Sequence, residues 1–297
     1  DWSSDVCSSD LDNYAKLVTI TGASNVTGYK NPIYDIAKLV HKFGCKLLVD
    51  GAQLVPHAPF IMNNDNSEYN IDFLIFSAHK MYAPFGTGVL IGPKNILDNC
   101  EPDLVGGGTV DIVTHDFVKW NESPQRHEAG SPNVIGSVAL ASAIKTLNKI
   151  GMANVERIEK NLTSYALSQI KNIPNVKIYC DTSKEVDRVS IIPFNICGIH
   201  HALVAKILSY EWGISVRSGC FCAQPYLVKL LNISSEFLDE RIKNPDLYHP
   251  GMVRISFGLY NTYSEIDLLV YALKKISLKR DYYIIKYENM KKTLFDV

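Results

Sequence analysis

The sequence has 297 residues, of which 46% are hydrophobic and 21% charged, and its net charge at pH 7 is −1. Such a chain is long enough for two globular domains, and its charge excludes the strongly basic surface of a nucleic-acid-binding protein. No apolar run approaches the ~20 residues that span a bilayer, so no membrane association is expected.

The first eleven residues are treated separately from the rest of the chain. Residues 1–11 show neither a helical nor a strand period and resemble the translation of a sequencing-library adapter. We therefore regard them as an artefactual tail; the alternative is a disordered acidic and serine-rich tail. The chain has no initiator methionine and enters an apolar strand soon after residue 12, which indicates an N-terminally truncated fragment. We expect a large domain over 12–150 and a small domain over 151–297.

Short apolar strands alternate with helical patterns in the first half of the chain. The pattern predicts strands at 17–20, 46–50, 71–77 and 89–92, and a helix at 33–43. Strands joined by helical crossovers indicate an α/β domain with a mainly parallel sheet and helices on both faces. Ligands of such sheets bind at the carboxyl ends of the strands, where Asp50 and Lys80 are expected.

The second half of the chain predicts a smaller α+β layer behind two long helices. The pattern predicts helices at 134–150, 154–170, 201–210 and 264–276, strands at 176–179, 189–196, 214–217 and 253–257, and a surface helix after Ser277. Strand and helix signals of this kind, without a regular βαβ alternation, are typical of α+β domains.

Lys80 is the most informative residue, because it follows a strand end and stands beside a histidine and a hydroxyl. A lysine there is well placed to form a Schiff base with pyridoxal phosphate (PLP). PLP also needs a carboxylate for its pyridine nitrogen, which Asp50 can supply, and Gln53 can donate to its phenolic oxygen. Ser77 and His79 can hold the phosphate. The alternatives are a helix N-cap for Asp50 and a solvated loop lysine for Lys80.

The stretch from Arg217 to Pro225 contains the pair Cys220 and Cys222. A Cys-x-Cys pair is a weak metal signal and more often means two small buried residues, so no metal site is expected. The glycine-containing loop instead suits an exposed nucleophilic thiol. Arg254 is a candidate for bidentate binding of a substrate carboxylate; the alternative is a surface ion pair.

These motifs occur in the order found in class V of the fold-type I PLP enzymes, which the chain resembles from about residue 17 to residue 276. Within that class it is similar to cysteine desulfurases and selenocysteine lyases. The matching segments are Ser24-Asn25-x-x-Gly28, Asp50-Gly-Ala-Gln53, Ser77-Ala-His79-Lys80, Glu128-Ala-Gly-Ser131-Pro-Asn133, Arg217-x-Gly-x-x-Cys222-Ala-x-Pro225 and Arg254-x-Ser-x-x-x-Tyr260-Asn-Thr262.

The resemblance implies a role for each matching residue. Lys80 would bind the PLP aldehyde, Asp50 would pair with the pyridine nitrogen, and Gln53 would contact the phenolic oxygen. Ser77 and His79 would bind the phosphate, which Ser131 of the partner subunit in a homodimer would also reach. Asn25 and Arg254 would bind the carboxylate of the amino-acid substrate. Cys222 would attack the substrate sulfur and become a persulfide.

Three departures from the family pattern stand out. The family histidine that stacks on the ring, together with a phosphate-binding turn, would lie upstream of residue 12. Cys220 supplies a second thiol where the family usually has another residue type. The stretch from Cys222 to Arg254 is longer than usual and contains an inserted loop over 232–250.

The expected function is therefore a PLP-dependent cysteine desulfurase that releases sulfur from L-cysteine through a Cys222 persulfide and passes it to a sulfur-acceptor protein. The alternatives are a class V aminotransferase, epimerase or selenocysteine lyase that does not use Cys222, or an inactive fragment. The scattered cysteines and the absence of a secretory signal favour the cytoplasm, with organelle targeting left open.

Overall fold

The computed structural model describes residues 15–182, 186–244 and 247–295, with the backbone alone for 288–295. The residues interpreted as an adapter-like tail lie outside this part of the chain. Two compact units form: the first comprises residues 15–22 and 31–152, and the second comprises residues 23–30 and 153–295. Residues 23–30 therefore fold with elements that follow far later in the sequence.

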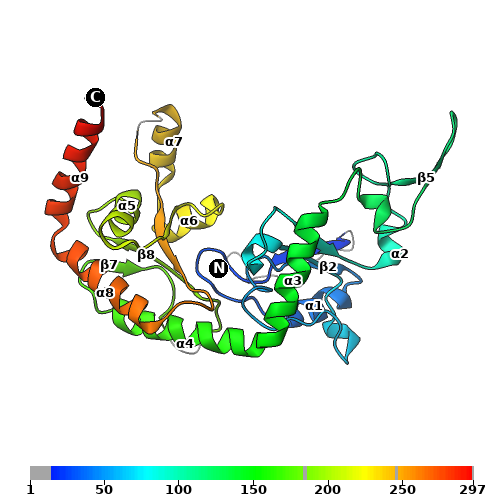
Figure 1. The fold of residues 1–297 in the computed structure, drawn as a ribbon, viewed down its shortest axis with the longest axis horizontal. Helices are drawn as coiled ribbons and strands as arrows, with labels where there is room; N and C mark the ends of the chain where they lie inside the picture. The colour runs from blue at the N-terminus through cyan, green and yellow to red at the C-terminus, as the bar shows by residue number, and fades with distance from the viewer. Residues whose placement is uncertain (1–14, 183–185, 245–246, 296–297) are drawn as a thin grey trace. The chain divides into compact units, whose positions relative to one another are not determined.

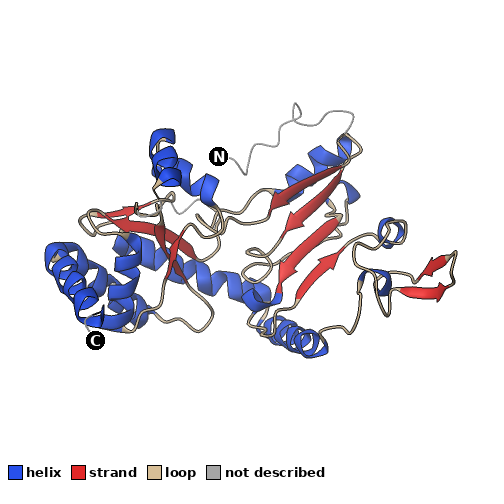
Figure 2. Cartoon of the chain, turned by 90° about the horizontal axis from the view of Figure 1, so that it is seen from above, coloured by secondary structure: helices blue, strands red, loops and turns tan. Residues whose placement is uncertain are grey.

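The first unit is an α/β layer (Figures 1 and 2). Its elements are β1 (Leu17–Thr21), α1 (Ile33–Lys42), β2 (Lys46–Asp50), the 3-10 turn η2 (Ser67–Tyr69), β3 (Phe73–Ser77), the 3-10 turn η3 (Ala78–Met81), β4 (Gly88–Ile91), α2 (Lys94–Leu97), β5 (Val110–Val113), β6 (Val118–Trp120), the 3-10 turn η4 (Gln125–His127) and α3 (Val134–Ile150).

A four-stranded sheet with the order β1-β2-β3-β4 organises this unit. β1, β2 and β3 are parallel, whereas β4 returns antiparallel to β3. Asp50 stands opposite Thr21 on one side and Ile75 on the other. Because parallel strands end at the same edge, this register brings the residues that follow β2 and β3 to one edge of the sheet.

Asp72 fixes the opposite edge, where β2 and β3 begin. Its Oδ2 accepts a hydrogen bond from the Leu47 N–H at 2.9 Å and lies 2.8 Å from His41 Nε2, and its Oδ1 accepts one from Lys46 Nζ at 2.8 Å. Burial opposes the charge, but these hydrogen bonds lower the pKa of Asp72 below its usual 3.8. The ionised carboxylate therefore ties α1, β2 and β3 together.

The second unit is an α+β layer built on a four-stranded sheet with the order β7-β8-β10-β9. Its elements are α4 (Met152–Ile170), β7 (Val176–Ile178), β8 (Ile191–Ile196), α5 (His201–Trp212), β9 (Arg217–Gly219), α6 (Gln224–Leu231), α7 (Ser235–Lys243), β10 (Met252–Ser256), α8 (Tyr263–Leu278) and α9 (Arg280–Phe295). Each of its strand pairs is antiparallel.

One apolar core holds the second unit together. The fully buried Phe194 of β8 and Val253 of β10 pack with Ile207 of α5 and Leu273 of α8, and α4 adds Leu167. Burying side chains of this size contributes about 1.5–3 kcal/mol each. The sheet is therefore a rigid support for the loops at its ends.

The α/β prediction with a mainly parallel sheet is confirmed, and most predicted elements agree with the observed ones to within two residues. The predicted strand at 214–217 is wrong, because pairing with β10 starts only at Arg217. Gly213, with a φ of +66°, ends α5 there. The inserted loop at 232–250 contains helix α7, which Ser234 caps by accepting a hydrogen bond from the Phe237 N–H. The β5–β6 hairpin was not predicted.

Candidate active site

Asp50 ends β2 at the sheet edge of the first unit. The parallel ladder continues past it, since the Gly22 N–H donates to the Asp50 carbonyl and the Gly51 N–H to the Ile75 carbonyl, both at 2.8 Å. The Asp50 Oδ1 accepts from the Ala52 N–H at 2.9 Å, a turn contact rather than an α-helix N-cap. A carboxylate has about four acceptor sites, so Asp50 keeps the capacity to accept a cationic N–H.

Ser77, His79 and Lys80 stand at the end of the neighbouring strand. Ser77 closes β3 and precedes η3, which carries His79 and Lys80. Tyr82 ends this turn in the left-handed region, with a φ of 63°. His79 is exposed and Lys80 is half-buried. A hydroxyl, an imidazole and an amine are thus presented within four consecutive residues.

Gln53 and Ser131 occupy different surroundings in the same unit. Gln53 lies in the turn after β2 and is only 8% exposed, and buried amides of this kind are hydrogen-bonded. Ser131 is exposed in the loop before α3. That loop is fixed by Asn133, whose side chain accepts from the Gly136 N–H at 2.9 Å and donates to the Phe85 carbonyl at 2.6 Å.

Cys222 belongs to the second unit, in a tight turn directly after β9. The Ala223 N–H donates to the Cys220 carbonyl at 2.9 Å and closes the turn. Both central residues are left-handed, with φ of 55° for Phe221 and 61° for Cys222. Turns of this type favour glycine or asparagine, so two bulky residues here cost on the order of 1–3 kcal/mol each. Backbone strain of this kind concentrates at functional sites. In this turn the Cys222 side chain is exposed to solvent.

Phe221 anchors that turn in the second unit. Its side chain is 5% exposed, its ring lies 5.2 Å from the Arg254 guanidinium carbon, and its carbonyl accepts a hydrogen bond from Asn25 Nδ2. Arg254 Nη1 in turn donates to the Asn25 carbonyl at 2.8 Å. Asn25, Phe221 and Arg254 therefore form one cluster. This cluster fixes Phe221, the residue that directly precedes Cys222 in the turn.

Arg254 retains a donor without a partner in this cluster. Its Nε is buried and makes no hydrogen bond among the described residues. Burial, followed by the nearby charge of Arg217, lowers the pKa of Arg254, while the Cys222 sulfur opposes that lowering. A buried guanidinium donor without an acceptor is costly, and a carboxylate is the group whose geometry it fits. The alternative interpretation of Arg254 as a surface ion pair is wrong, since no acidic group bonds it within the described residues.

The structure thus gathers the predicted residues into two sets, each within its own unit. The first set is Asp50, Gln53, Ser77, His79 and Lys80; the second is Asn25, Cys222 and Arg254. Phe221 was missed by the sequence analysis, because an aromatic residue beside a cysteine carries no signal of its own.

Comparison with known proteins identifies the family of the chain. The model of the family "Aminotransferase class-V" matches residues 3–269. The chain belongs to this family. The cysteine desulfurase of Shigella sonnei (strain Ss046) is 36% identical over 267 residues, which cover 90% of this chain and 59% of that protein. That of Escherichia coli (strain K12 / DH10B) is 35% identical with the same coverage. The chain therefore spans about three-fifths of the length of these curated relatives.

Several solved structures share the fold of this chain. The cysteine desulfurase CsdA of Escherichia coli, in an S-sulfonic acid form, superposes with a TM-score of 0.77 at 30% identity and covers 91% of this chain and 61% of its own. The apo cysteine desulfurase of Thermococcus onnurineus NA1 gives 0.77 at 31%, covering 89% and 60%. A mutant of C-DES with glycine covalently linked to its PLP cofactor, at 18% identity and a TM-score of 0.69, shows likeness of fold alone.

The first set of side chains in this class V chain fits PLP by its chemistry. An amine, a carboxylate, a buried amide, a hydroxyl and an imidazole at one sheet edge match the aldehyde, pyridine nitrogen, phenolic oxygen and phosphate. The described residues contain no group of three or more His, Cys, Asp or Glu side chains that could hold a metal ion. No helix in the described ranges is long and apolar enough to cross a membrane.

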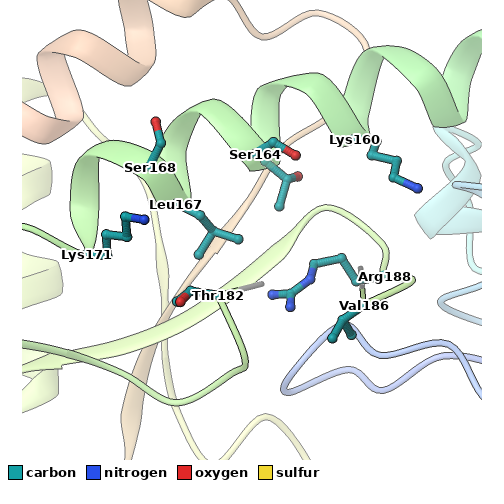
Figure 3. A pocket seen from close by; sticks show the side chains of 9 residues that line it. Lys160, Ser164, Leu167, Ser168, Lys171, Thr182, Val186 and Arg188 are labelled. Atoms are coloured by element: carbon teal, nitrogen blue, oxygen red, sulfur yellow. The ribbon is translucent and has the colours of Figure 1, made fainter. Parts of the chain in front are cut away.

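A hollow beside α4, in the second unit, contains none of the predicted site residues (Figure 3). Lys160 and Lys171 stand at its rim and Arg188 lies in its wall. Arg188 is 7% exposed, and its guanidinium donates to Cys180 Sγ and to the Asp181 carbonyl. The Arg188 guanidinium thus bonds the segment that follows β7. It differs in this from Arg254, whose Nε has no partner among the described residues.

Proposed function

We propose that the full-length protein is a PLP-dependent cysteine desulfurase that takes sulfur from L-cysteine onto Cys222 and leaves alanine. The observation that supports this proposal most directly is the strained turn that exposes the Cys222 thiol beside the buried, unpartnered Nε of Arg254. A nucleophile and a carboxylate-binding group thus stand close together, as an amino-acid substrate with a reactive side chain requires.

Five residues of the first unit would hold the cofactor. Lys80 would bind its aldehyde, Asp50 would hold its pyridine nitrogen, Gln53 would contact its phenolic oxygen, and Ser77 with His79 would bind its phosphate. When bound, PLP supplies an electron sink that weakens the bonds at the α-carbon of the amino acid. The Asp50 carboxylate keeps the ring nitrogen protonated, because an opposite charge favours the cationic form.

Lys80 would also carry protons during the reaction. Its primary amine would serve as the base for the α-proton of the bound amino acid. Lysine is a residue type that performs this task in enzymes, and Lys80 is half-buried just after a strand end. The same amine can return the proton as alanine forms.

Arg254 and Asn25 would position the substrate carboxylate. The Nε of Arg254, which makes no hydrogen bond among the described residues, can donate to one carboxylate oxygen. Asn25 Nδ2 has two hydrogens, of which one is donated to the Phe221 carbonyl, so the second is available. Held by these donors, the substrate is oriented relative to Cys222.

Cys222 would then receive the sulfur. Its thiolate attacks the sulfur of the bound L-cysteine: a bond forms between the Cys222 Sγ and that sulfur, and the bond between the sulfur and the β-carbon breaks. The released electron pair ends, with a proton, on the carbon skeleton that leaves as alanine.

Product analysis tests the proposal. The full-length protein with PLP, L-cysteine and a thiol reductant is expected to give alanine and sulfide in equal amounts. 3-Mercaptopyruvate in place of alanine would indicate an aminotransferase, D-cysteine an epimerase, and turnover of selenocysteine alone a selenocysteine lyase. Absence of any turnover by a PLP-loaded full-length protein would contradict the proposal.

Replacing Arg254 by lysine tests carboxylate binding. The variant keeps the positive charge but loses the planar pair of donors, and a hydrogen bond to a charged group is worth about 1.5–3 kcal/mol. We expect KM for L-cysteine to rise about 10- to 100-fold, with a smaller change in kcat. Arg157→Lys is the matched control, because Arg157 is an exposed arginine of α4 in the same unit. An unchanged KM in Arg254→Lys would remove Arg254 from the substrate site.

The remaining proposals concern assembly and location. We infer a homodimer in which Ser131, exposed in the loop before α3, reaches the phosphate site of the partner subunit. Sulfur would leave Cys222 for an acceptor protein, for which the exposed thiol is accessible. None of the six described cysteines forms a disulfide, which agrees with a reducing compartment such as the cytoplasm.

A further inference from the structure

Cys220 is a second thiol that the mechanism above does not use. It opens the turn that exposes Cys222, and the hydrogen bond from the Ala223 N–H to its carbonyl holds both cysteines in that turn. Two residues of extended chain span at most about 7 Å, and a turn is shorter still. The two Cα atoms therefore lie in the range of about 4.4–6.8 Å that sulfur–sulfur bonds commonly bridge.

The strand register of the second unit brings a histidine to Cys220. Gly219 of β9 stands opposite Met252 of β10, so the residue after Gly219 meets the segment before Met252. The Cys220 Sγ lies 3.5 Å from His249 Nδ1 and 3.3 Å from the Pro250 carbonyl. The imidazole of His249 is exposed, whereas Cys220 is half-buried. His249 thus connects a recessed thiol to solvent.

His249 is held in this position by the body of the unit. Its carbonyl lies 3.2 Å from His200 Nε2 and 2.9 Å from His201 Nε2, at the start of α5. Gly251 permits this contact, since a Cβ there would stand 2.4 Å from the His201 ring. The pairing of Cys220 with His249 therefore depends on packed elements and not on the tip of a loop.

The contacts of Cys220 suit a thiol that transfers its proton to a neighbouring imidazole when it reacts. Burial raises the pKa of the Cys220 thiol, so the resting form is protonated and can donate to the Pro250 carbonyl. His249 Nδ1 also lies 2.9 Å from that carbonyl. When His249 Nδ1 carries a hydrogen, it can donate to the Pro250 carbonyl. When it carries none, it can accept a hydrogen bond from the Cys220 thiol. Thiolates of higher pKa are intrinsically stronger nucleophiles once formed.

We propose that Cys220 is a second sulfur carrier, which takes the terminal sulfur from a persulfide on Cys222; this inference rests on the proposed function of Cys222. The Cys220 Sγ forms a bond to the terminal sulfur, and the bond between that sulfur and the Cys222 Sγ breaks. The electron pair leaves on Cys222 as thiolate, and the Cys220 proton passes to His249 Nδ1. The exchange needs neither oxidant nor reductant, and it frees Cys222 for a second substrate.

Peptide mass spectrometry after a single exposure to L-cysteine tests the transfer. The full-length holoenzyme is incubated without reductant and then alkylated. We expect sulfane sulfur on both Cys220 and Cys222 in the wild type, and on Cys222 alone in Cys220→Ser. In His249→Ala we expect sulfur to appear on Cys220 at least tenfold more slowly, with loading of Cys222 preserved. His115→Ala, which removes an exposed histidine of the first unit, is the control.

A second arm separates this proposal from the desulfurase proposal. Inorganic polysulfide loads an exposed thiol without PLP or substrate, so the PLP-free protein can be used. Transfer to Cys220 with polysulfide but not with L-cysteine would overturn the desulfurase function and keep the relay. Sulfur confined to Cys222 in both arms would overturn the relay. So would loading of Cys220 at the wild-type rate in Cys222→Ser, or a Cys220–Cys222 disulfide formed in place of the second persulfide.

Discussion

Replacing Lys80 by alanine is expected to abolish both the cofactor absorbance band of the full-length protein and its turnover of L-cysteine. The amine is the only group in the first set that can bond covalently to an aldehyde, so its loss removes the anchor and the base together. Loss of acid–base catalysis alone costs about 10²- to 10⁴-fold in rate. The measurement is the visible spectrum of the purified protein together with alanine formation.

Lys80→Arg separates the covalent role of the amine from its charge. The arginine keeps a cation at the end of β3, but a guanidinium is not deprotonated in proteins and cannot serve as the nucleophile. We expect the same loss of band and activity as in Lys80→Ala. Lys42→Ala, at the exposed end of α1, should leave both unchanged. A normal cofactor spectrum in Lys80→Arg would contradict the proposal that Lys80 binds the PLP aldehyde.

The cofactor half of the site could be predicted because it depends on local order. β2 and β3 are short strands rich in apolar residues, Asp50 and Ser77 are their last residues, and His79 and Lys80 follow in the next turn. Once strands joined by a crossover are taken as parallel, their ends must meet at one edge. Asp50 and Lys80 thus share an edge even though thirty positions separate them in the sequence.

The sulfur half depends on contacts between distant segments, and less of it could be predicted. Asn25 joins Phe221 and Arg254 across about two hundred residues of sequence. The left-handed turn at Phe221 and Cys222 carries no glycine or asparagine signal, because tertiary contacts overrule the local preference. His249 reaches Cys220 only through the register of β9 and β10. Neither periodicity nor spacing indicates such contacts.

The β9 region shows the same limit at the level of secondary structure. The stretch 214–217 alternates apolar and polar residues as a strand does, yet the backbone pairs only from Arg217 onward. The Ile214 N–H instead donates to the Leu208 carbonyl at 3.0 Å, a contact that finishes the end of α5. The left-handed Gly213 ends α5, and Ile214 completes this helix end instead of starting a strand. The prediction from the alternating pattern did not take this helix end into account.

Replacing Cys222 by serine is expected to abolish sulfide release from L-cysteine while the cofactor spectrum stays intact. Serine is nearly isosteric, so the anchored turn should keep its shape. Its hydroxyl, however, is a weak nucleophile at neutral pH unless a base activates it, and no persulfide can form on oxygen. We expect a fall of at least about 10²-fold in sulfide release, measured in the presence of a thiol reductant.

The spectrum and the matched variants decide what such a loss means. Cys222→Ser should still show a spectral change on addition of L-cysteine, because Asn25 and Arg254 would continue to bind the substrate carboxylate. Cys100→Ser, an exposed cysteine of the first unit, should behave as wild type. Unchanged sulfide release in Cys222→Ser would make Cys222 a loop residue and exclude a persulfide on Cys222 as the source of the sulfide. Retained substrate binding without sulfide release would instead assign the sulfur transfer to the strained turn that β9 and Phe221 hold in place.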